Sequence, residues 1–400
     1  NVFQVRFGIK YVVVFNSFRE INEFSIKNGR SLMSRPINYV FHNLLSTTQG
    51  FTVGSSPYGE SYLKKKKVIS SHLNGKSIKE YIDVLESEST VMLKNLISSN
   101  PELHCPPSCE CPKCSCCYLL DIDLGYFMQL YVLKVALKLT YGEKYDVYNK
   151  YLDFSKEIIH VENQIIKIRS PTSSFANYFP FLRAFPNSLA HEYRVRRDNY
   201  INGLRIQSSN KIAKNDITAT SSIIGGLIKS SLSPAEIMSI CLTMISAGLD
   251  NTPLSFNHLM GHLSKNYGAK MQEKAYNNIL TLYSGNFDLA WKMVALERKC
   301  IYVEALLLES MRYFTVLPLG LPRETTKDIC YNGATIPRGT TVFFNLYSAN
   351  HDEAVFLNPG VFDPERWIDD ETGKLQPNLE HLRFGLGGRK CPGDRLATME

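Results

Sequence analysis

The apolar residues of this 400-residue chain recur mostly at intervals of three and four residues. This spacing places them on one face of a helix and is typical of amphipathic α-helices. Strand-like alternation is confined to two short segments, residues 1–15 around a Gly-containing turn and residues 335–344 with a turn at 337–339. The pattern predicts a mainly α fold with a small β-rich portion. Its long helices are expected at residues 78–97, 126–139, 145–168, 190–206, 234–263 and 290–314.

The segment that begins at Pro234 carries the clearest helix signals. Ser233 is an N-cap candidate, Pro234 occupies the first helical position, and Glu236 completes a capping box. Further along, Pro253 has no N–H to donate to the carbonyl of Leu249, so we expect the helix to kink or widen there.

Two stretches, 101–117 and 207–233, lack periodicity and are predicted to be surface loops. No apolar run approaches the roughly 18 to 20 residues that cross a bilayer. The chain opens without Met on a strand-like segment and stops inside a helix that begins near Pro392. We therefore expect it to be truncated at both ends, with an anchor or signal upstream.

The composition is that of an ordinary globular protein, with 44% hydrophobic residues and 45 Lys and Arg against 38 Asp and Glu, a net charge of +7. It excludes a disordered or collagen-like chain. At roughly 150 residues per domain, the length suggests two or three domains or one large core. The ten cysteines are unevenly spaced, unlike a secreted disulfide framework, which favours a reducing compartment.

Six of the cysteines lie between Cys105 and Cys117. Thiolates at such short spacing could close a zinc site. The many prolines and the position between two predicted helices also fit a loop insertion or retained non-coding sequence. We interpret 101–117 as a Cys-rich loop insertion.

The most specific motif is Phe384-Gly-Leu-Gly-Gly-Arg-Lys-Cys-Pro-Gly393. A thiol just before a helix N-terminus lies near the positive end of the helix dipole, and Arg389 and Lys390 add positive charge, so the pattern favours a thiolate at Cys391. The glycines allow the backbone to approach a flat partner closely. The alternative is a turn with a buried structural cysteine.

This loop resembles the haem-binding loop of the cytochrome P450 superfamily, Phe-Gly-x-Gly-x-Arg-x-Cys-x-Gly. The resemblance implies a cytochrome P450 fold with haem b, in which Cys391 is the axial thiolate ligand of the iron. It also implies that Phe384 packs beside the sulfur, that Arg389 pairs with a haem propionate, and that Gly387 and Gly393 belong to the cofactor site. Thiolate ligation points to oxygen activation.

The segment Ala247-Gly-Leu-Asp-Asn-Thr-Pro253 resembles the family's distal motif, which places Ala247 and Gly248 over the haem. Asn251 stands where the family usually has a Thr that holds a proton-delivering water. Because an amide still donates and accepts hydrogen bonds, our hypothesis is that Asp250 and Asn251 relay protons with Thr252 in support.

Two further resemblances concern charged residues. Glu309 and Arg312 match the family's Glu-x-x-Arg pair, which implies a buried structural triad closed by Arg366. Tyr62 and Lys66 fall where the family often has Trp-x-x-x-Arg at a haem propionate. The lysine run 64–67 otherwise fits a solvated helix face or part of a basic surface for an acidic reductase.

Several longer strings resemble the fungal phenylacetate-hydroxylase-like branch of the superfamily; they cover residues 35–42, 46–57, 192–198, 239–250 and 332–337. The branch resemblance implies insertion of one oxygen atom from O2 into a small aromatic acid. It also implies that the electrons come from NADPH through a reductase, that the enzyme lies at the cytosolic face of the endoplasmic reticulum membrane, and that nucleic acid is not a partner. Candidate pocket walls are residues 41–57, Ile245, Ala247 and residues 316–319.

Motifs from Ala247 to Gly393 must converge on one haem, so we expect residues 1–400 to form a single catalytic domain. Two alternatives stay open: a monooxygenase acting on a tyrosine-derived or alkyl substrate, and a haem- or metal-binding protein without monooxygenase activity.

Overall fold

The computed structural model describes residues 1–47, 51–98, 123–142, 151–170 and 174–400. The strands are β1 (Val2–Phe7), β2 (Lys10–Phe15), β3 (Arg323–Glu324), β4 (Ile329–Tyr331), β5 (Ala334–Ile336) and β6 (Thr341–Phe344). The helices are α1 (Phe18–Asn28), α2 (Glu60–His72), α3 (Gly75–Glu80), α4 (Ile82–Ser98), α5 (Leu124–Tyr141), α6 (Tyr151–Arg169), α7 (Ser188–Ala213), α8 (Ile217–Ser221), α9 (Ile223–Ile228), α10 (Pro234–Ser246), α11 (Asn251–Leu263), α12 (Asn266–Leu282), α13 (Phe287–Glu297), α14 (Ile301–Tyr313), α15 (Leu346–Asn350) and α16 (Asp394–Met399). Shorter helical turns include η1 (Gly29–Leu32), η2 (Tyr39–Leu45), η4 (Phe175–Asn177), η5 (Pro180–Ala184), η6 (Pro364–Trp367) and η7 (Gly387–Arg389).

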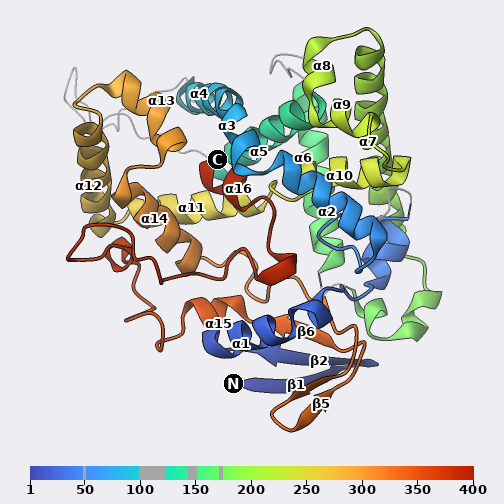
Figure 1. Cartoon of the computed structure of the whole chain (residues 1–400). Helices are drawn as coiled ribbons and strands as arrows, with labels where there is room; N and C mark the ends of the chain where they lie inside the picture. Colours follow the sequence, from blue (N-terminus) through green and yellow to red (C-terminus); the bar gives the residue numbers. More distant parts are fainter. Residues whose placement is uncertain (48–50, 99–122, 143–150, 171–173) are drawn as a thin grey trace, which may run out of the picture.

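The described part is mostly helical, with its strands gathered at one end beneath α1 and α15 (Figure 1). Four strands form a mixed sheet in the order β1-β2-β6-β3, and β4 and β5 form a separate hairpin. The hairpin β1-β2 pairs Val2 with Phe15, and β2 then runs parallel to β6. Because β2 consists largely of valines that are buried on the sheet, it holds the two ends of the sequence together.

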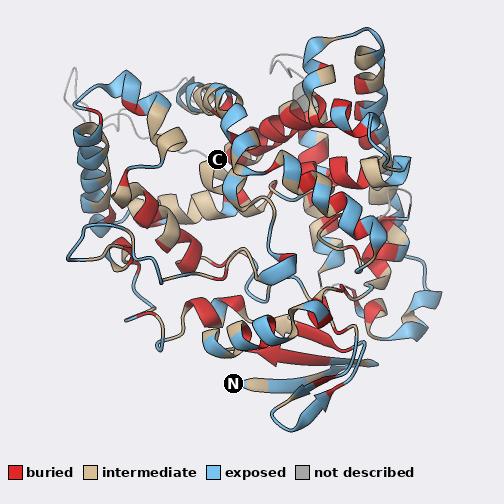
Figure 2. Cartoon of the chain, in the orientation of Figure 1, coloured by how far each residue is buried: buried red, intermediate tan, exposed pale blue. Residues whose placement is uncertain are grey.

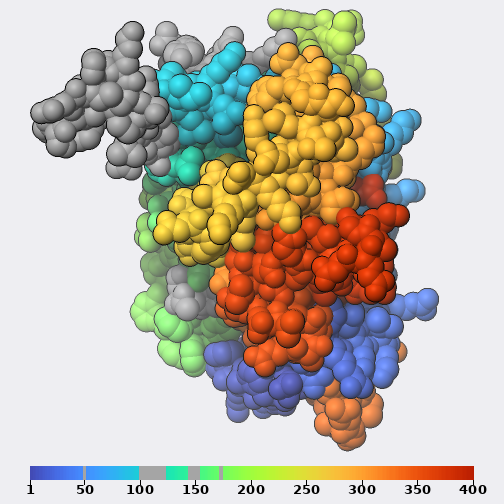
Figure 3. Space-filling model, turned by 90° about the vertical axis from the view of Figure 1, so that its left-hand side faces the viewer, coloured from blue at the N-terminus to red at the C-terminus, as the bar shows by residue number. Residues whose placement is uncertain are grey.

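The helical part is built around α5, which is buried along most of its length (Figure 2). Helices α4, α6, α9, α10 and α11 all pack against it. A helix that is apolar on nearly every side is stable only inside such a bundle. In the space-filling view, the red C-terminal segment lies between the blue N-terminal strands and the yellow and orange α12–α13 region, so residues far apart in sequence meet there (Figure 3).

Most of the predicted elements are confirmed. The opening hairpin turns at Gly8, the capping box of α10 forms between Ser233 and Glu236, and helices cover the six predicted segments. Three of those segments are interrupted: 78–97 at Tyr81, 234–263 at residues 247–250, and 290–314 at Arg298, which adopts a left-handed conformation. The first residues of the 145–168 segment lie outside the described part.

The break between α10 and α11 follows from Pro253. The turn 247–250 lies one turn upstream of the proline, where the missing N–H would otherwise have bonded the carbonyl of Leu249. The predicted kink is confirmed, and it separates two helices at the distal motif.

The prediction of a surface loop at 207–233 is wrong. Helix α7 continues to Ala213, and α8 and α9 follow, with Ile223, Ile224 and Leu227 buried in the helical core. The Ser- and Asn-rich composition concealed a short apolar stripe that tertiary packing stabilises as helix. The other predicted loop, 101–117, lies outside the described residues.

Among the described helices, none combines the length and the apolar character that a bilayer span requires.

Candidate functional site

Cys391 lies in a glycine-rich loop that ends at α16. Gly385 and Gly387 have φ of 72° and 57°, in the region that favours glycine, and the backbone N–H of Cys391 donates to the carbonyl of Phe384 at 2.9 Å. A Cβ on Gly388 would lie 2.5 Å from the sulfur of Met33, so a larger residue there would require the Met33 side chain to move. The loop is therefore shaped by backbone constraints that hold one exposed thiol in place.

The electrostatics of Cys391 differ from the expectation. Desolvation raises the pKa of its thiol, although the N–H of Gly393 and the charges of Arg383 and Lys390 act in the opposite direction. Arg389 does not contribute, because its guanidinium points away to the carbonyls of Met33 and Ser56 at 2.6 and 2.8 Å. Helix α16 begins at Asp394, three residues after the cysteine, which confirms the expectation of a helix start near Pro392. The protein alone thus does not favour the thiolate.

Three arginines from distant segments meet beside this loop: Arg35, Arg323 on β3, and Arg389. Burial, together with the positive charge of Arg389, lowers the pKa of Arg35 to about 9 and that of Arg323 to about 10. Their bonds go to backbone carbonyls, and no ion pair joins them to a carboxylate in the described part of the chain. Sequence reasoning missed Arg35 and Arg323, since no local motif marks them.

Tyr62 and Lys66 from α2 complete this cationic cluster, which we define as Arg35, Arg323, Arg389, Tyr62 and Lys66. The guanidinium of Arg389 lies 3.6 Å from the ring centroid of Tyr62, and both Tyr62 Oη and Lys66 Nζ donate to the carbonyl of Gly388. The Nη1 of Arg389 is buried without an acceptor. Concentrated positive charge with an unsatisfied buried donor calls for an anionic partner.

The lysine run on α2 is not simply a solvated face. Lys65 is buried, and its Nζ donates to the carbonyl of Phe51 and to the hydroxyls of Ser56 and Ser239 at 2.9, 2.8 and 3.2 Å. Burial lowers its pKa to about 8. Lys65 therefore ties the segment before α2 to α10 instead of facing solvent.

The turn 247–250 brings the distal motif near α5 and α6, but its side chains face different partners. Asp250 accepts from Gln129 at 3.0 Å, and burial raises its pKa. The amide of Asn251 donates to the carbonyl of Ala247 at 2.7 Å. The buried Thr252 donates to Glu400 at 3.0 Å, and burial raises the pKa of Glu400 to about 7. No sequence signal pointed to Glu400.

Ala247 is exposed although it lies between apolar helices, and a Cβ on Gly248 would lie 3.2 Å from Val132. Of the other candidate pocket walls, Phe41 and Ile245 are buried while Leu317 and Leu319 are exposed. Ala247 and Gly248 have little or no side chain, so the turn occupies little space at the point where the resemblance places the haem.

Glu309 is fully buried and is surrounded by donors. Arg312 binds it through two bonds of 2.9 and 2.7 Å, Arg366 adds one of 3.2 Å and the indole of Trp367 one of 2.9 Å. Burial opposes ionisation, but these cations outweigh it and hold the pKa of Glu309 below its usual value. The structure therefore brings the three charged residues together.

This network reaches the cysteine loop through Asn350. Arg312 Nη1 donates to the carbonyl of Asn350 at 2.8 Å, and the side-chain oxygen of Asn350 accepts the backbone N–H of Leu382 at 2.8 Å. Leu382 lies two residues before the motif that begins at Phe384. The ring of Phe384 lies 6.0 Å from that of His381. The charged triad thus anchors the segment that leads into the loop.

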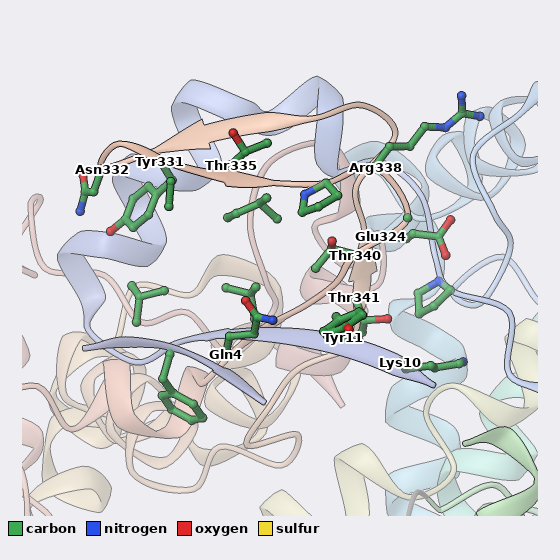
Figure 4. A pocket seen from close by; sticks show the side chains of 18 of the residues that line it. Gln4, Lys10, Tyr11, Glu324, Tyr331, Asn332, Thr335, Arg338, Thr340 and Thr341 are labelled. Atoms are coloured by element: carbon green, nitrogen blue, oxygen red, sulfur yellow. The ribbon is translucent and has the colours of Figure 1, made fainter. Parts of the chain in front are cut away.

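A groove of 1030 Å³ lies elsewhere, between the sheet and the β4-β5 hairpin (Figure 4). Gln4, Lys10, Glu324, Tyr331 and Arg338 are among the residues that line it. Neither Cys391, the cationic cluster nor the turn 247–250 borders it. The candidate functional residues therefore lie outside this groove.

In the described part of the chain, no group of three or more His, Cys, Asp or Glu side chains is arranged to hold a metal ion. The cysteines between Cys105 and Cys117 lie outside the described residues.

The chain belongs to the cytochrome P450 family, whose sequence profile matches residues 1–400. It is 37% identical over its whole length to phenylacetate 2-hydroxylase of Emericella nidulans, covering 74% of that protein, and 34% identical to 3-hydroxyphenylacetate 6-hydroxylase of the same organism, covering 73%. It is 30% identical to a cytochrome P450 monooxygenase of Mycosarcoma maydis, covering 72%. The chain is a P450 monooxygenase, and its family implies a haem-thiolate cofactor.

The residues present fit that cofactor. Haem carries two carboxylates, and the cationic cluster supplies buried guanidinium groups, including the unsatisfied Nη1 of Arg389, that need an anionic partner. Cys391 supplies an exposed thiol on the adjoining loop, and its raised pKa is the behaviour expected of a thiol before a metal ion stabilises its thiolate.

We expect Cys391→Ser to abolish the thiolate-type absorption band of the reduced, carbon-monoxide-bound protein, because serine cannot supply a thiolate to iron. The matched control is Cys330→Ser, which removes another exposed cysteine and should leave the band unchanged. Retention of the band in Cys391→Ser would remove Cys391 from this role.

Proposed function

We propose that this P450 monooxygenase hydroxylates a small aromatic acid such as phenylacetate. The proposal is carried by the whole-length similarity to two hydroxylases named for phenylacetates. One atom of O2 enters the C–H bond of the substrate and the other leaves as water, with two electrons from NADPH, delivered by a reductase, and two protons. We also propose that residues 1–400 form one catalytic domain.

The residues of the chain have separate roles in this proposal. Haem bound by the thiolate of Cys391 supplies the oxygen activation. The cationic cluster, Arg389, Tyr62, Lys66, Arg35 and Arg323, would bind the haem carboxylates. Phe384, Gly387 and Gly393 shape the loop around the sulfur. The network of Glu309, Arg312 and Arg366 holds that loop in place through Asn350.

Proton delivery is assigned to the turn between α10 and α11. The side-chain amide of Gln129 donates to Asp250 and also to Asn163 on α6. These two hydrogen bonds orient the carboxyl group of Asp250. A buried carboxyl with a raised pKa exchanges protons more readily near neutral pH. Asn251 lies next to it, with Thr252 bonded to Glu400 behind.

We place the enzyme at the cytosolic face of the endoplasmic reticulum membrane. Exposed apolar residues gather between α6 and α7, and the β1-β2 turn joins them through a bond of 3.2 Å from Ile9 N–H to the carbonyl of Tyr178. Such a patch on a basic protein favours contact with an anionic lipid surface. Its residues are Phe7, Ile9, Phe175, Phe179, Phe181, Phe185 and Leu189.

With haem, reductase, NADPH and O2 supplied, phenylacetate is expected to shift the haem spectrum on binding and to yield a singly hydroxylated phenylacetate, detected by mass spectrometry. A tyrosine-derived or alkyl acid offered in parallel should give less product. No shift and no product with phenylacetate, but turnover of another compound, would favour the alternative substrate class. No turnover of any compound would favour a non-catalytic haem protein.

Asn251→Ala is expected to uncouple the reaction, so that NADPH is consumed with less hydroxylated product, because the alanine offers no donor or acceptor for a proton-carrying water. The ratio of product to NADPH measures the effect. Asn257→Ala on the same helix serves as the control and should leave the ratio unchanged. Full coupling in Asn251→Ala would show that Asn251 is not part of the relay.

Replacing Phe181 and Phe185 together by serine should lower the fraction of the chain that sediments with vesicles containing anionic lipid. These two side chains are 70% and 69% exposed, and their transfer to the acyl region is favourable. Ile217→Ser changes a residue on α8 that is even more exposed, at 82%, but lies outside this patch, and it should have little effect. Equal binding by all three proteins would exclude this surface as the contact.

A further inference from the structure

Arg169, the last residue of α6, is exposed and yet surrounded by protein. Desolvation and the neighbouring charge of Arg197 lower its pKa, while the carboxylates of Glu162 and Asp250 act in the opposite direction. Its guanidinium lies 5.7 Å from the ring centroid of Phe41. Phe41 belongs to η2 and is the first residue of the candidate pocket wall 41–57. The side chain of Arg169 is thus accessible to solvent although protein atoms desolvate its guanidinium.

Arg169 has no acceptor among the described residues: no hydrogen bond or ion pair joins it to a carboxylate in that part of the chain. Two arginines of α7 differ from Arg169, because each has a carboxylate partner. Arg196 binds Glu157 and Glu192, and Arg197 binds Glu162. Since a guanidinium has five N–H donors, Arg169 retains its full capacity to bind an anion.

A second guanidinium beside it is incompletely satisfied. Arg197 is 1% exposed and grips Glu162 through Nε and Nη2, but its Nη1 is buried with no acceptor. Glu162 is already occupied, because Tyr200 also donates to it at 2.6 Å. Glu162 is therefore engaged by Arg197 and Tyr200, and one N–H donor of Arg197 stays unsatisfied in the interior.

The nearby Asp250 does not neutralise Arg169 by an ion pair. Its carboxylate bonds the amide of Gln129 at 3.0 Å, and burial raises its pKa. The field of Arg169 acts on Asp250, so the two groups are neighbours. An anion held at Arg169 would thus lie beside the turn 247–250, which the proposed function assigns to proton delivery.

We propose that Arg169, with the free Nη1 edge of Arg197, binds the carboxylate of the aromatic acid substrate and so orients its ring in the site. The inference deepens the proposed function and rests on it for the aromatic part of the ligand. A charge-assisted bond to a guanidinium is among the stronger polar interactions and is directional. Phe41 holds the Arg169 guanidinium by cation–π contact and leaves its N–H edge available.

The test measures spectral dissociation constants of the haem-loaded full chain for phenylacetate and for its neutral analogue phenylacetamide. Arg169→Gln should weaken phenylacetate binding about ten- to a hundredfold, the range expected for loss of a charge-assisted pair, and should leave phenylacetamide nearly unchanged. Arg169→Lys keeps the positive charge but loses the paired N–H donors of the guanidinium, so its dissociation constant for phenylacetate should lie between those of the parent protein and Arg169→Gln. Lys156→Gln removes an exposed cation from the same helix and should change neither constant.

Loss of acid and amide binding to the same extent in Arg169→Gln would overturn the proposal, as would unchanged binding of both. The same measurement with 3-phenylpropionate, benzoate and their amides separates the two proposals. If phenylacetate is not hydroxylated but another carboxylate binds in an Arg169-dependent way, only the substrate assignment fails. If phenylacetate is hydroxylated and Arg169→Gln does not distinguish acid from amide, only the anchor fails. If no aromatic carboxylate binds the parent protein, the anchor is wrong as well.

Discussion

The position of the cysteine loop depends on the hydrogen bonds and ion pairs of one buried carboxylate, that of Glu309. It is fully removed from solvent, and it is stable as an anion only because Arg312, Arg366, Trp367 and the backbone N–H of Asp363 converge on it. Through Arg312 and Asn350 the same network holds Leu382 at the entrance to the loop. A displacement of the Glu309 side chain would therefore also displace the Cys391 thiol, although the two residues are far apart in the sequence.

The buried charged groups of this protein are of two kinds: those neutralised within the chain support the structure, and those left without a partner in the described part of the chain are candidates for binding a ligand. At Glu309 the donors and acceptors are satisfied within the chain, which makes the network a rigid support. At the cationic cluster, three guanidinium groups meet with no carboxylate among the described residues, and Arg389 keeps an unsatisfied buried donor. At Arg169 and Arg197 the compensation is incomplete. Since uncompensated buried charge is costly, these last two places are where the fold needs an anionic ligand.

Local signals in the sequence were sufficient for the elements of the fold that depend on neighbouring residues. The capping box at Ser233, the interruption upstream of Pro253 and the hairpin around Gly8 follow from hydrogen-bond geometry within a few residues. The segment 207–233 was misjudged, because α9 is stabilised by burial of Ile224 and Leu227 in the core and not by its own propensity. Lys65 was misjudged for the same reason, since its three acceptors come from distant segments.

The sequence by itself determined the fold class, the family motif around Cys391, and the pairing of Glu309 with Arg312, because residues three positions apart on a helix share a face. Only the tertiary structure decided which charges are left without a partner. Arg35 and Arg323 lie near Arg389 although Arg35 is far from both in the sequence, and Thr252 donates to Glu400, which follows α16 beyond the cysteine loop. Desolvation and charge compensation depend on distance in space, so they cannot be read from spacing along the chain.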